Sequence, residues 1–515
     1  MKTDKLKAMG DIAPEYVNSA AALKKKRRPF IGAAVAAAAL VAVGLSAFLA
    51  ARALRKDDIG EKTASSDPTT RPTETVSEAP TEAPSPTPTW PAFTPQPLDV
   101  PMIVPTMTLP DGVSASFASV PDTPNYPSSK YFDYRRTLAS SAFYAGSSLT
   151  GFYNATTAQF LLSGEKDQNA VYSPLNVYMA LAMAAETADG ETREQLLDLL
   201  GAPDIGSLRE QANKLFISNY FDNKALISLP AASLWIDNGA CPYIKENTLK
   251  TLGEIYHASS FTGEMGDPEF TKLYRDWLNE QTHDLLKDQV NELELNSEDL
   301  MHILTTLYFK TSWANKFHEG NNTVETFRSP TGDEQVTFMH GGAESYYELN
   351  GFTMVHKGLN ENTGVWFVLP DKGVSLEDVV KNGEALNAIL TDPYDAQVQG
   401  AVVHLHMPKV DVESTLDLEK GLKNLGVTDC FDPSGANFSP LTDLEGVYIS
   451  SVTHGARVIM NEDGVEAAAY TDIGYAGAAE PLRIVEFTLD RPFMFVITGM
   501  DGTPLFVGTV YHPGA

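Results

Sequence analysis

Two histidines are the residues of this 515-residue chain most obviously spaced for chemistry. His404 and His406 lie two positions apart in an alternating, largely apolar stretch, residues 402–410, which is predicted to be a strand. Residues two apart on a strand share one face, and imidazole nitrogens are ligands for transition metals. A metal site also needs a carboxylate or a third histidine in register. None is evident, so we interpret the two histidines as a solvated pair and predict no metal site.

The chain lacks the short motifs that mark common catalytic sites. It contains no Gly-x-Ser-x-Gly turn, no His-Glu-x-x-His helix, no Cys-x-x-Cys pair and no phosphate-binding loop. Its two cysteines, Cys241 and Cys430, are far apart in sequence and are interpreted as ordinary buried thiols. We therefore expect a protein that is not an enzyme and that needs no cofactor.

The most informative segment is residues 461–479, which starts like a strand and ends like a loop. Val465, Ala467, Ala469 and Thr471 alternate along one face and are small or β-branched, so this face fits between two existing strands. Three consecutive alanines nevertheless make a poor permanent strand, because strands favour larger β-branched and aromatic residues. The following residues are rich in glycine and alanine, which is typical of an exposed loop. This combination indicates a conformational switch.

Motifs in a fixed order give the chain a resemblance to the serpins. The segment from residue 462 has the family's hinge form, Glu-x-Gly-[Thr/Ser/Val]-Glu-Ala-Ala-Ala. The other matching stretches are Val-Tyr-Ser-Pro-Leu-Asn-Val (171–177), Leu-Tyr-Phe-Lys-Thr-Ser-Trp (307–313), Phe-Val-Leu-Pro-Asp (367–371), His-Met-Pro-Lys-Val (406–410) and Phe-Thr-Leu-Asp-Arg-Pro-Phe (487–493). Together they extend over most of the C-terminal three quarters of the chain.

The resemblance implies an α+β fold, with helices packed around a large central β-sheet plus smaller sheets, and an exposed reactive-centre loop. A protease attacks this loop as a substrate and forms an acyl-enzyme. The cut loop then enters the central sheet as a new strand and traps the protease. The hinge residues implied are Glu462, Gly464, Val465, Glu466, Ala467, Ala468, Ala469, Tyr470 and Thr471. None of the expected inward-facing residues is charged, large or proline, which favours an active inhibitor over a member that has lost inhibition.

The scissile bond follows from the position of the hinge. Counting the family's usual distance from Glu462 places the bond between Ala478 and Ala479. Counting back from Pro492 gives the bond between residues 481 and 482 instead, because this loop is longer than in common relatives. We favour the count from the hinge, since the length that inserts is set from that side.

The residue before the cut predicts the target protease. Ala478 fits the small pocket of an elastase- or subtilisin-like serine protease, because such pockets select by size. Arg483 and Tyr475 leave trypsin-like and chymotrypsin-like enzymes as alternatives.

The resemblance also identifies the residues through which the sheet opens. Ser173, Asn176, Thr305 and His454 correspond to the shutter, and Trp313 corresponds to the breach at one end of the sheet. Asn176 stands where many serpins have Ser, and Thr305 replaces an Asn that pairs with the histidine. We expect the Asn176 amide to take over the role lost at Thr305.

The N-terminal region predicts a membrane anchor. Residues 1–29 end in a basic run and are expected to be a cytoplasmic tail, and residues 30–51 carry no charge. As a helix, the latter would span about 33 Å, enough for a hydrocarbon core of about 30 Å. The excess of Lys and Arg before this span orients the rest of the chain outside the cell. A secretory signal that is cleaved off is the alternative.

Residues 52–130 are rich in Pro, Thr, Ser and Glu and hold nearly half of the chain's 32 prolines. Such a composition cannot bury enough apolar surface to fold, so we predict a disordered spacer there and a serpin domain over residues 131–515. An anchor followed by a spacer favours a membrane-anchored, bacterial-type family member.

The net charge of the chain limits the classes of binding partner that we expect. The net charge of −29 disfavours nucleic acid, and residues 196–216, where heparin-binding serpins often carry Lys and Arg, show no basic cluster. The expected partners are therefore a serine protease, bound by an extracellular domain, and the membrane. The alternatives are a non-inhibitory surface binding or adhesion module with the same fold, and an inhibitor of cysteine proteases.

Local signals predict individual elements. Asp267 and Pro268 precede apolar residues at helical spacing, so residues 267–278 are predicted to be a helix. Residues 414–426 show the same spacing and end in Gly426, and they are also predicted to be a helix. Residues 493–510 are predicted to form strands.

Overall fold

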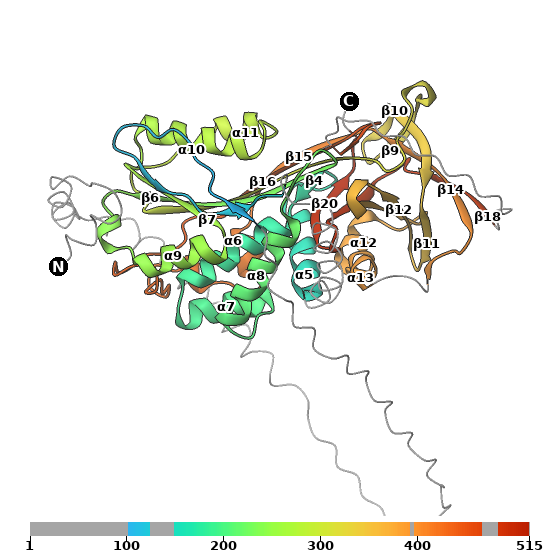
Figure 1. The fold of residues 1–515 in the computed structure, drawn as a ribbon. Helices are drawn as coiled ribbons and strands as arrows, with labels where there is room; N and C mark the ends of the chain where they lie inside the picture. Colours follow the sequence, from blue (N-terminus) through green and yellow to red (C-terminus); the bar gives the residue numbers. More distant parts are fainter. Residues whose placement is uncertain (1–100, 124–148, 392–395, 466–482, 514–515) are drawn as a thin grey trace, which may run out of the picture. The chain divides into compact units, whose positions relative to one another are not determined.

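A large sheet with eight strands organises the fold (Figure 1). The structure, a computed structural model, describes residues 101–123, 149–391, 396–465 and 483–513. The strand order is β15–β16–β17–β8–β6–β7–β2, and β5 pairs with β6 outside this path. These strands are β2 (Ser114–Ser116), β5 (Phe221–Asp222), β6 (Leu226–Asp237), β7 (Ala258–Gly263), β8 (Met301–Ser312), β15 (Val410–Asp417), β16 (Thr453–Met460) and β17 (Gly464–Val465). Only β6 and β7 pair in parallel; the other neighbours are antiparallel.

Two smaller sheets complete the strand architecture. A six-stranded sheet has the order β11 (Ser345–Leu349), β12 (Phe352–Gly358), β13 (Gly364–Pro370), β19 (Phe493–Thr498), β20 (Pro504–Val510) and β4 (Ala170–Tyr172). A four-stranded sheet has the order β18 (Arg483–Thr488), β14 (Ala401–Pro408), β10 (Gly332–Ala343) and β9 (Thr323–Ser329). The short strands β1 (Met102–Ile103) and β3 (Val120–Pro121) pair with each other. The predicted strands over residues 402–410 and 493–510 are confirmed.

Helices cover both faces of the large sheet (Figure 1). α6, α8 and α9 contact it from one face, and α10 packs on β6 and β8 from the other. The α-helices are α5 (Thr150–Leu161), α6 (Pro174–Thr187), α7 (Gly190–Leu200), α8 (Ile205–Asn219), α9 (Glu246–Ile255), α10 (Pro268–Gln281), α11 (Lys287–Asn291), α12 (Leu376–Asn382), α13 (Glu384–Thr391) and α14 (Glu419–Asn424). The 3-10 helices are η2 (Cys241–Tyr243), η3 (Glu319–Asn321), η4 (Asn360–Asn362) and η6 (Asp429–Phe431). The predicted α+β class is confirmed.

The α10 helix forms where its sequence signals predict. The Asp267 carboxylate accepts hydrogen bonds from the N–H groups of Glu269 (2.8 Å) and Phe270 (3.1 Å), which caps the first turn. The helix buries its apolar stripe against the sheet, where the Trp235 and Phe261 rings stack with centroids 4.2 Å apart. Cap and stripe agree, so this helix was predictable.

The prediction of a helix over residues 414–426 is wrong for its first part. Residues 414–417 belong to β15, and the helix α14 begins only at Glu419. The cause is tertiary: the Ser414 hydroxyl donates to the Val171 carbonyl (2.6 Å), and Leu416 pairs with His454 of β16. Sheet pairing overrides the local helical spacing here.

The prediction that a disordered spacer extends to residue 130 is wrong for residues 101–123. Within this stretch β2 pairs with β7 as an edge strand of the large sheet. The ring of Phe117 packs edge-on against Phe261, with centroids 5.8 Å apart. Phe117 and its apolar neighbours give this part of the spacer enough hydrophobic surface to fold against the sheet.

The remaining predictions for the N-terminal region, residues 1–100, lie outside the described residues. Among the residues that are described, no helix combines the length and the apolar character that crossing a bilayer requires. The predicted anchor over residues 30–51 is not among them. The two cysteines are free, with Cys430 buried and Cys241 only partly buried.

Candidate functional site

A tight turn between β16 and β17 begins the predicted hinge. The side-chain oxygen of Asn461 accepts hydrogen bonds from the N–H groups of Asp463 (3.0 Å) and Gly464 (3.4 Å), which closes the turn. Gly464 then lies directly against β8. A Cβ atom there would lie 2.6 Å from Cα of Ser312 and closer still to the carbonyl oxygen of Thr311, so only glycine fits. This contact explains the hinge glycine.

Glu462 anchors the same turn through its side chain. One carboxylate oxygen lies 2.8 Å from Nζ of Lys409 and accepts a hydrogen bond from Nδ2 of Asn322 (2.5 Å). Burial favours the neutral acid, but these two donors outweigh it and lower the pKa of Glu462. The carboxylate is therefore charged at neutral pH, and it ties the start of the hinge to the segments beside it.

Trp313 covers the turn from β8, as the resemblance implies for the breach. Its ring Nε1 donates to the carbonyl of Asn461 (2.8 Å), and its backbone N–H donates to that of Asp463 (3.0 Å). Lys357 lies beneath it, fully buried, with Nζ 5.4 Å from the Trp313 ring centroid and 4.4 Å from that of Phe317. Burial lowers the pKa of Lys357 to about 8.

Sequence reasoning missed three residues of this region. Lys409 was within a matched motif, but nothing marked it as the partner of Glu462. Asn322 and Lys357 carried no signal, because each acts through contacts between segments far apart in sequence.

The strand β17 occupies the point at which the large sheet is incomplete. It has two residues, and among the described residues the sheet's path from β16 to β8 passes through β17 alone. Met460 of β16 pairs with Val465, which pairs on its other side with Thr311 of β8. Val465 is buried. One residue of the predicted inward-facing set is therefore already in the sheet.

The start of α6 lies across both strands that flank this gap. Ser173 caps the helix, because its hydroxyl accepts a hydrogen bond from the N–H of Asn176 (3.3 Å). The backbone N–H of Ser173 donates to Nε2 of His454 on β16 (2.9 Å). The bond fixes the tautomer of His454, since Nε2 accepts and the ring proton must be on Nδ1.

Asn176 reaches the opposite strand. In the amide orientation that satisfies both partners, its side chain donates to the carbonyl of Thr306 (3.0 Å) and accepts from the N–H of Leu307 (3.1 Å), both on β8. The hydroxyl of Thr305 donates to the backbone carbonyl of Asn176 (3.1 Å). The structure therefore brings Ser173, Asn176, Thr305 and His454 together. The expectation that the Asn176 amide replaces the missing partner of His454 is wrong. The amide binds β8, and the backbone N–H of Ser173 is the hydrogen-bond partner of His454.

The rest of the predicted loop lies outside the described residues. This applies to the hinge from Glu466 to Thr471 and to the scissile pair, Ala478 and Ala479. Their flanks are described: residues 466–482 join β17 of the large sheet to β18, the edge strand of the four-stranded sheet. Arg483, the first residue of β18, forms an ion pair with Glu348 (2.7 Å) of β11, so it links the four-stranded sheet to the six-stranded sheet.

The histidine pair has a neighbouring histidine and a neighbouring carboxylate that the sequence did not indicate. His406 lies beside His340 of β10, and the cluster includes Glu325 of β9. The premise that no carboxylate or third histidine lies in register is therefore wrong.

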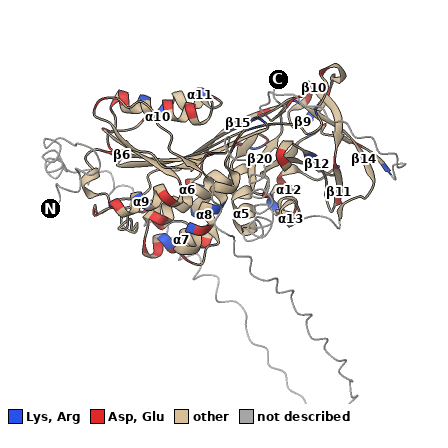
Figure 2. Cartoon of the chain, viewed as in Figure 1, with Lys and Arg blue, Asp and Glu red and all other residues tan. Residues whose placement is uncertain are grey.

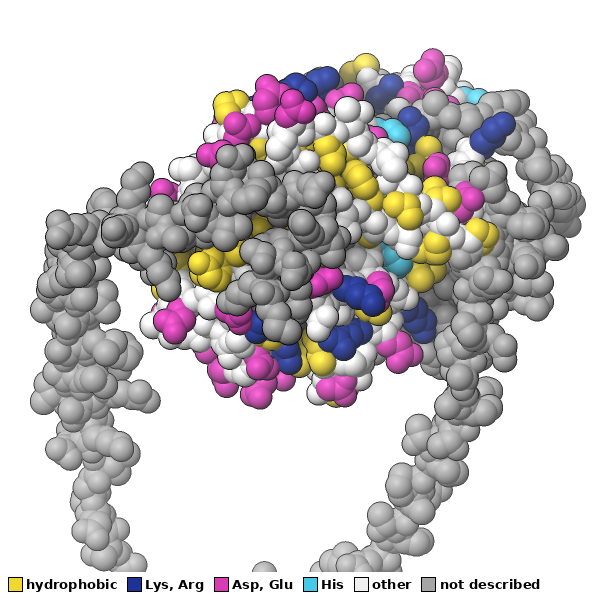
Figure 3. Space-filling view, turned by 60° about the vertical axis from the view of Figure 1, so that its left-hand side comes forward, with side chains coloured by type: hydrophobic (Ala, Val, Ile, Leu, Met, Phe, Trp, Pro, Cys, Tyr) yellow, Lys and Arg dark blue, Asp and Glu magenta, His cyan; other side chains and the backbone are white. Residues whose placement is uncertain are grey.

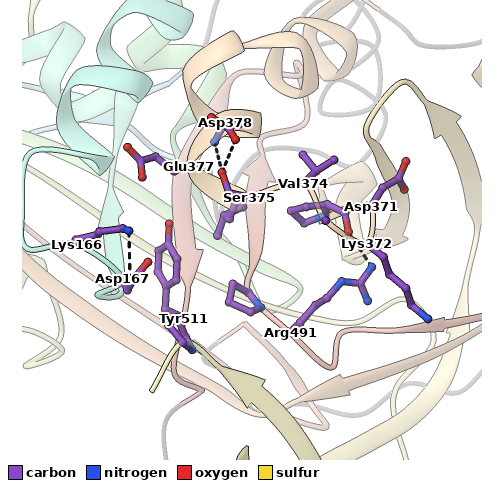
Figure 4. A pocket seen from close by; sticks show the side chains of 15 residues that line it. Lys166, Asp167, Asp371, Lys372, Val374, Ser375, Glu377, Asp378, Arg491 and Tyr511 are labelled. Atoms are coloured by element: carbon purple, nitrogen blue, oxygen red, sulfur yellow. Dashed lines mark hydrogen bonds and ion pairs between the residues drawn. The ribbon is translucent and has the colours of Figure 1, made fainter. Parts of the chain in front are cut away.

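A hollow of about 500 Å³ lies elsewhere (Figure 4). None of its lining residues belongs to β8, β16, β17 or α6. Charges of both signs surround it, including Lys166, Lys372, Asp371 and Glu377 (Figure 4). The Arg491 guanidinium at its wall already donates to the Pro370 carbonyl (2.7 Å). The hollow therefore lacks a single-sign or apolar character that would select one class of ligand.

The helices α7 and α8 carry mixed charges. Figure 2 marks acidic and basic residues together on α7, and the face in Figure 3 shows acidic side chains among the basic ones. On α8, Arg209 is occupied by both carboxylate oxygens of Glu186, at 2.8 and 2.5 Å. An anionic polysaccharide would compete with this pair for Arg209.

The contacts of Asn176 predict the cost of shortening it. In Asn176→Ser the Thr306 carbonyl and the Leu307 N–H lose their partner, and an unsatisfied buried polar group costs about 1–3 kcal/mol. We expect the free energy of unfolding, measured by urea denaturation, to fall by this amount. Asn247→Ser, at an exposed position of α9, is the matched control and should change it by less than about 0.5 kcal/mol. Equal urea midpoints for the two variants would contradict this account of the shutter.

His454 predicts a pH dependence of stability. Full burial lowers its pKa to about 4, whereas the unfolded chain has a histidine pKa of about 6.5. The unfolded state therefore binds the proton first, and stability falls as the pH drops from 6.5 towards 4, by roughly 3 kcal/mol in all. In His454→Asn this part of the pH dependence should disappear from urea midpoints measured between pH 7.5 and 4.5. Parallel pH profiles for the two proteins would refute the prediction.

Comparison with known proteins agrees with this geometry. Residues 154–513, more than half of the chain, match the family described as Serpin (serine protease inhibitor). Human neuroserpin is 27% identical over 366 residues, which cover 68% of this chain and 87% of neuroserpin. A serpin-like protein of Methanosarcina acetivorans is 26% identical over 359 residues, covering 68% of this chain and 82% of that protein.

Solved structures show the same fold. The native state of the thermophilic serpin tengpin aligns with a TM-score of 0.62 at 24% identity, covering 71% of this chain and 93% of tengpin. Human thyroxine-binding globulin in complex with thyroxine aligns with a TM-score of 0.61 at 23% identity, covering 73% of this chain and 100% of the globulin. An Arabidopsis serpin in its native stressed conformation aligns with a TM-score of 0.63 at 22% identity, covering 72% of this chain and 98% of that serpin. By its sequence match and its fold, the chain belongs to the serpin family.

Proposed function

We propose that this serpin irreversibly inhibits a serine protease, by trapping the acyl-enzyme while the cleaved loop inserts between β16 and β8. One observation carries the proposal: β17, the first part of the predicted loop, already pairs with both strands. Insertion then extends an existing strand and needs no new nucleation.

The two registers predict where each following residue would go. Val465 pairs with Met460 and with Thr311, and both pairings are antiparallel. Continuing them places Ala467 between Val458 and Phe309. The same count places Ala469 between Ala456 and Leu307, and Thr471 between His454 and Thr305. The inward positions of the loop thus receive small side chains, and the last one arrives at the shutter.

Burial of the flanking strands supports the inward assignment. Val458, Ala456, Leu307 and Phe309 are buried, as is His454. Alanine needs little room between such neighbours, and Thr471 can form hydrogen bonds at the shutter. Each added ladder bond contributes about 0.5–1.5 kcal/mol net, so roughly a dozen bonds supply on the order of 10 kcal/mol. Inhibition requires that this insertion outrun hydrolysis of the acyl-enzyme.

The target we propose is an elastase- or subtilisin-like protease that cuts between Ala478 and Ala479. The small residue before the cut supports this choice. The trypsin-like alternative is disfavoured because Arg483 is already part of β18, where it pairs with Ala401 of β14.

We further propose that residues 30–51 anchor the protein in a membrane and that the serpin domain acts outside the cell. The uncharged span and the basic residues before it support this arrangement. The folded part then begins near residue 101 and the spacer ends there, because residues 101–123 pack on the large sheet.

A non-inhibitory role is the second candidate, since the fold is shared with thyroxine-binding globulin, which was solved with thyroxine bound. The small side chains at the inward positions favour inhibition, because nothing in them obstructs insertion. The two roles differ in one observable, a covalent complex with protease.

That complex is the first prediction of the proposal. Mixed with elastase, the protein should form an adduct that survives boiling in detergent. Mass spectrometry should find a released C-terminal fragment that begins at Ala479. Cleavage without an adduct would indicate a substrate and support the non-inhibitory alternative. A fragment that begins at Leu482 would move the bond but leave the mechanism.

Neighbouring alanines provide a matched test of insertion. Ala467→Glu should place a charge between Val458 and Phe309 without a partner, and such a buried charge costs several kcal/mol. Most loops should then be cut without forming the adduct, a shift of more than about tenfold in the ratio of adduct to cleaved protein. Ala468→Glu adds the same charge on the opposite face, near Arg457, and should leave the ratio almost unchanged. If both variants respond alike, the proposed register is wrong.

A further inference from the structure

Three potential metal ligands converge on the four-stranded sheet from three different strands. Glu325 of β9, His340 of β10 and His406 of β14 place one ligand atom each within 4.8 Å of one another. His340 and His406 are direct cross-strand partners, and their ring centroids lie 4.3 Å apart. Nε2 of His340 is 3.0 Å from a carboxylate oxygen of Glu325. Strand register pairs the two histidines, and the Glu325 side chain reaches them from a position opposite Val336.

The chemistry of this group matches zinc. Two imidazoles and one carboxylate are a common zinc ligand set, with metal–ligand distances of about 2.0–2.2 Å. The side chains are 34%, 23% and 27% exposed for Glu325, His340 and His406, so the site is anchored yet reachable from solvent. Small side-chain rotations would bring the ligand atoms to a tetrahedral spacing, and water can fill an open position.

Neighbouring groups would support the ligands. The Thr323 hydroxyl donates to Glu325 (2.6 Å) and lies 2.7 Å from Nε2 of His340, where it orients both. Glu486 of β18 has an oxygen 3.6 Å from Nε2 of His406 and places a further carboxylate beside the group.

We propose that Glu325, His340 and His406 form a site for a divalent transition-metal cation, with zinc as its best-matched ion. A bound ion would cross-link β9, β10 and β14. It would thereby stiffen the sheet that receives the loop at β18, which pairs with β14. The inference is independent of protease inhibition.

The test is zinc binding by the full-length protein, purified without a polyhistidine tag. Isothermal titration should give one saturable site, and zinc should raise the thermal unfolding midpoint. Cobalt(II) in place of zinc should give visible absorption bands that report imidazole ligation. In His406→Ala and His340→Ala, affinity should fall at least about tenfold, which is the lower range for loss of a mere supporting group. The cobalt bands should disappear.

Two further variants keep the proposal falsifiable. Glu325→Gln preserves the shape and removes the charge, so it should weaken zinc binding even if a histidine variant fails to fold. His404→Ala is the matched control, because His404 is on the same strand and is more exposed, but it is outside the cluster. It should bind zinc within a few-fold of the parent. Unchanged binding in Glu325→Gln, equal losses in His404→Ala and His406→Ala, or no saturable site in the parent would each overturn the proposal.

Discussion

The structure depends on the contacts that hold β16 and β8 at a fixed spacing, because these two strands do not pair with each other directly. β16 and β8 are connected through the two residues of β17 at one end and through the start of α6 further along. The helix does this with polar contacts, a backbone N–H to His454 and a side-chain amide to β8. Such contacts are directional, so they hold one spacing and release when the strands separate. A packed apolar contact would resist separation gradually, without a defined closed position.

At the β17 end of the gap between β16 and β8, the hinge turn is held by an ion pair and side-chain hydrogen bonds. Glu462 is charged and shares its carboxylate between Lys409 and Asn322, while Trp313 binds the carbonyl of Asn461. Glu462 would keep one donor if the other were removed, whereas removal of Glu462 itself would break both contacts at once. The loop therefore begins from a rigid point, and any strand it forms inherits the register of Val465.

The sequence predicted features that depend on a local residue type. It did not predict contacts between segments that are far apart in the chain. Gly464 was predictable as a hinge glycine, and its close approach to Thr311 and Ser312 shows why. Asp267 and Pro268 predicted the start of α10, because a helix cap is local. Residues 101–123 were misjudged, since their composition resembles a spacer and their partners lie on β7. His340 and Glu325 could not be linked to His406 without the strand register that joins β9, β10 and β14.

The position of β2 has a mechanical consequence. β2 is an edge strand of three residues, paired antiparallel with β7 among the described residues, and the chain reaches it through β1, which pairs with β3. A pulling force on the N-terminal side would load the β1–β3 pair first and this edge next. It would peel β2 away from β7 before the strain reached β8, which is separated from β7 by β6. The region between β16 and β8 is thereby shielded from tension that is applied to the N-terminal side.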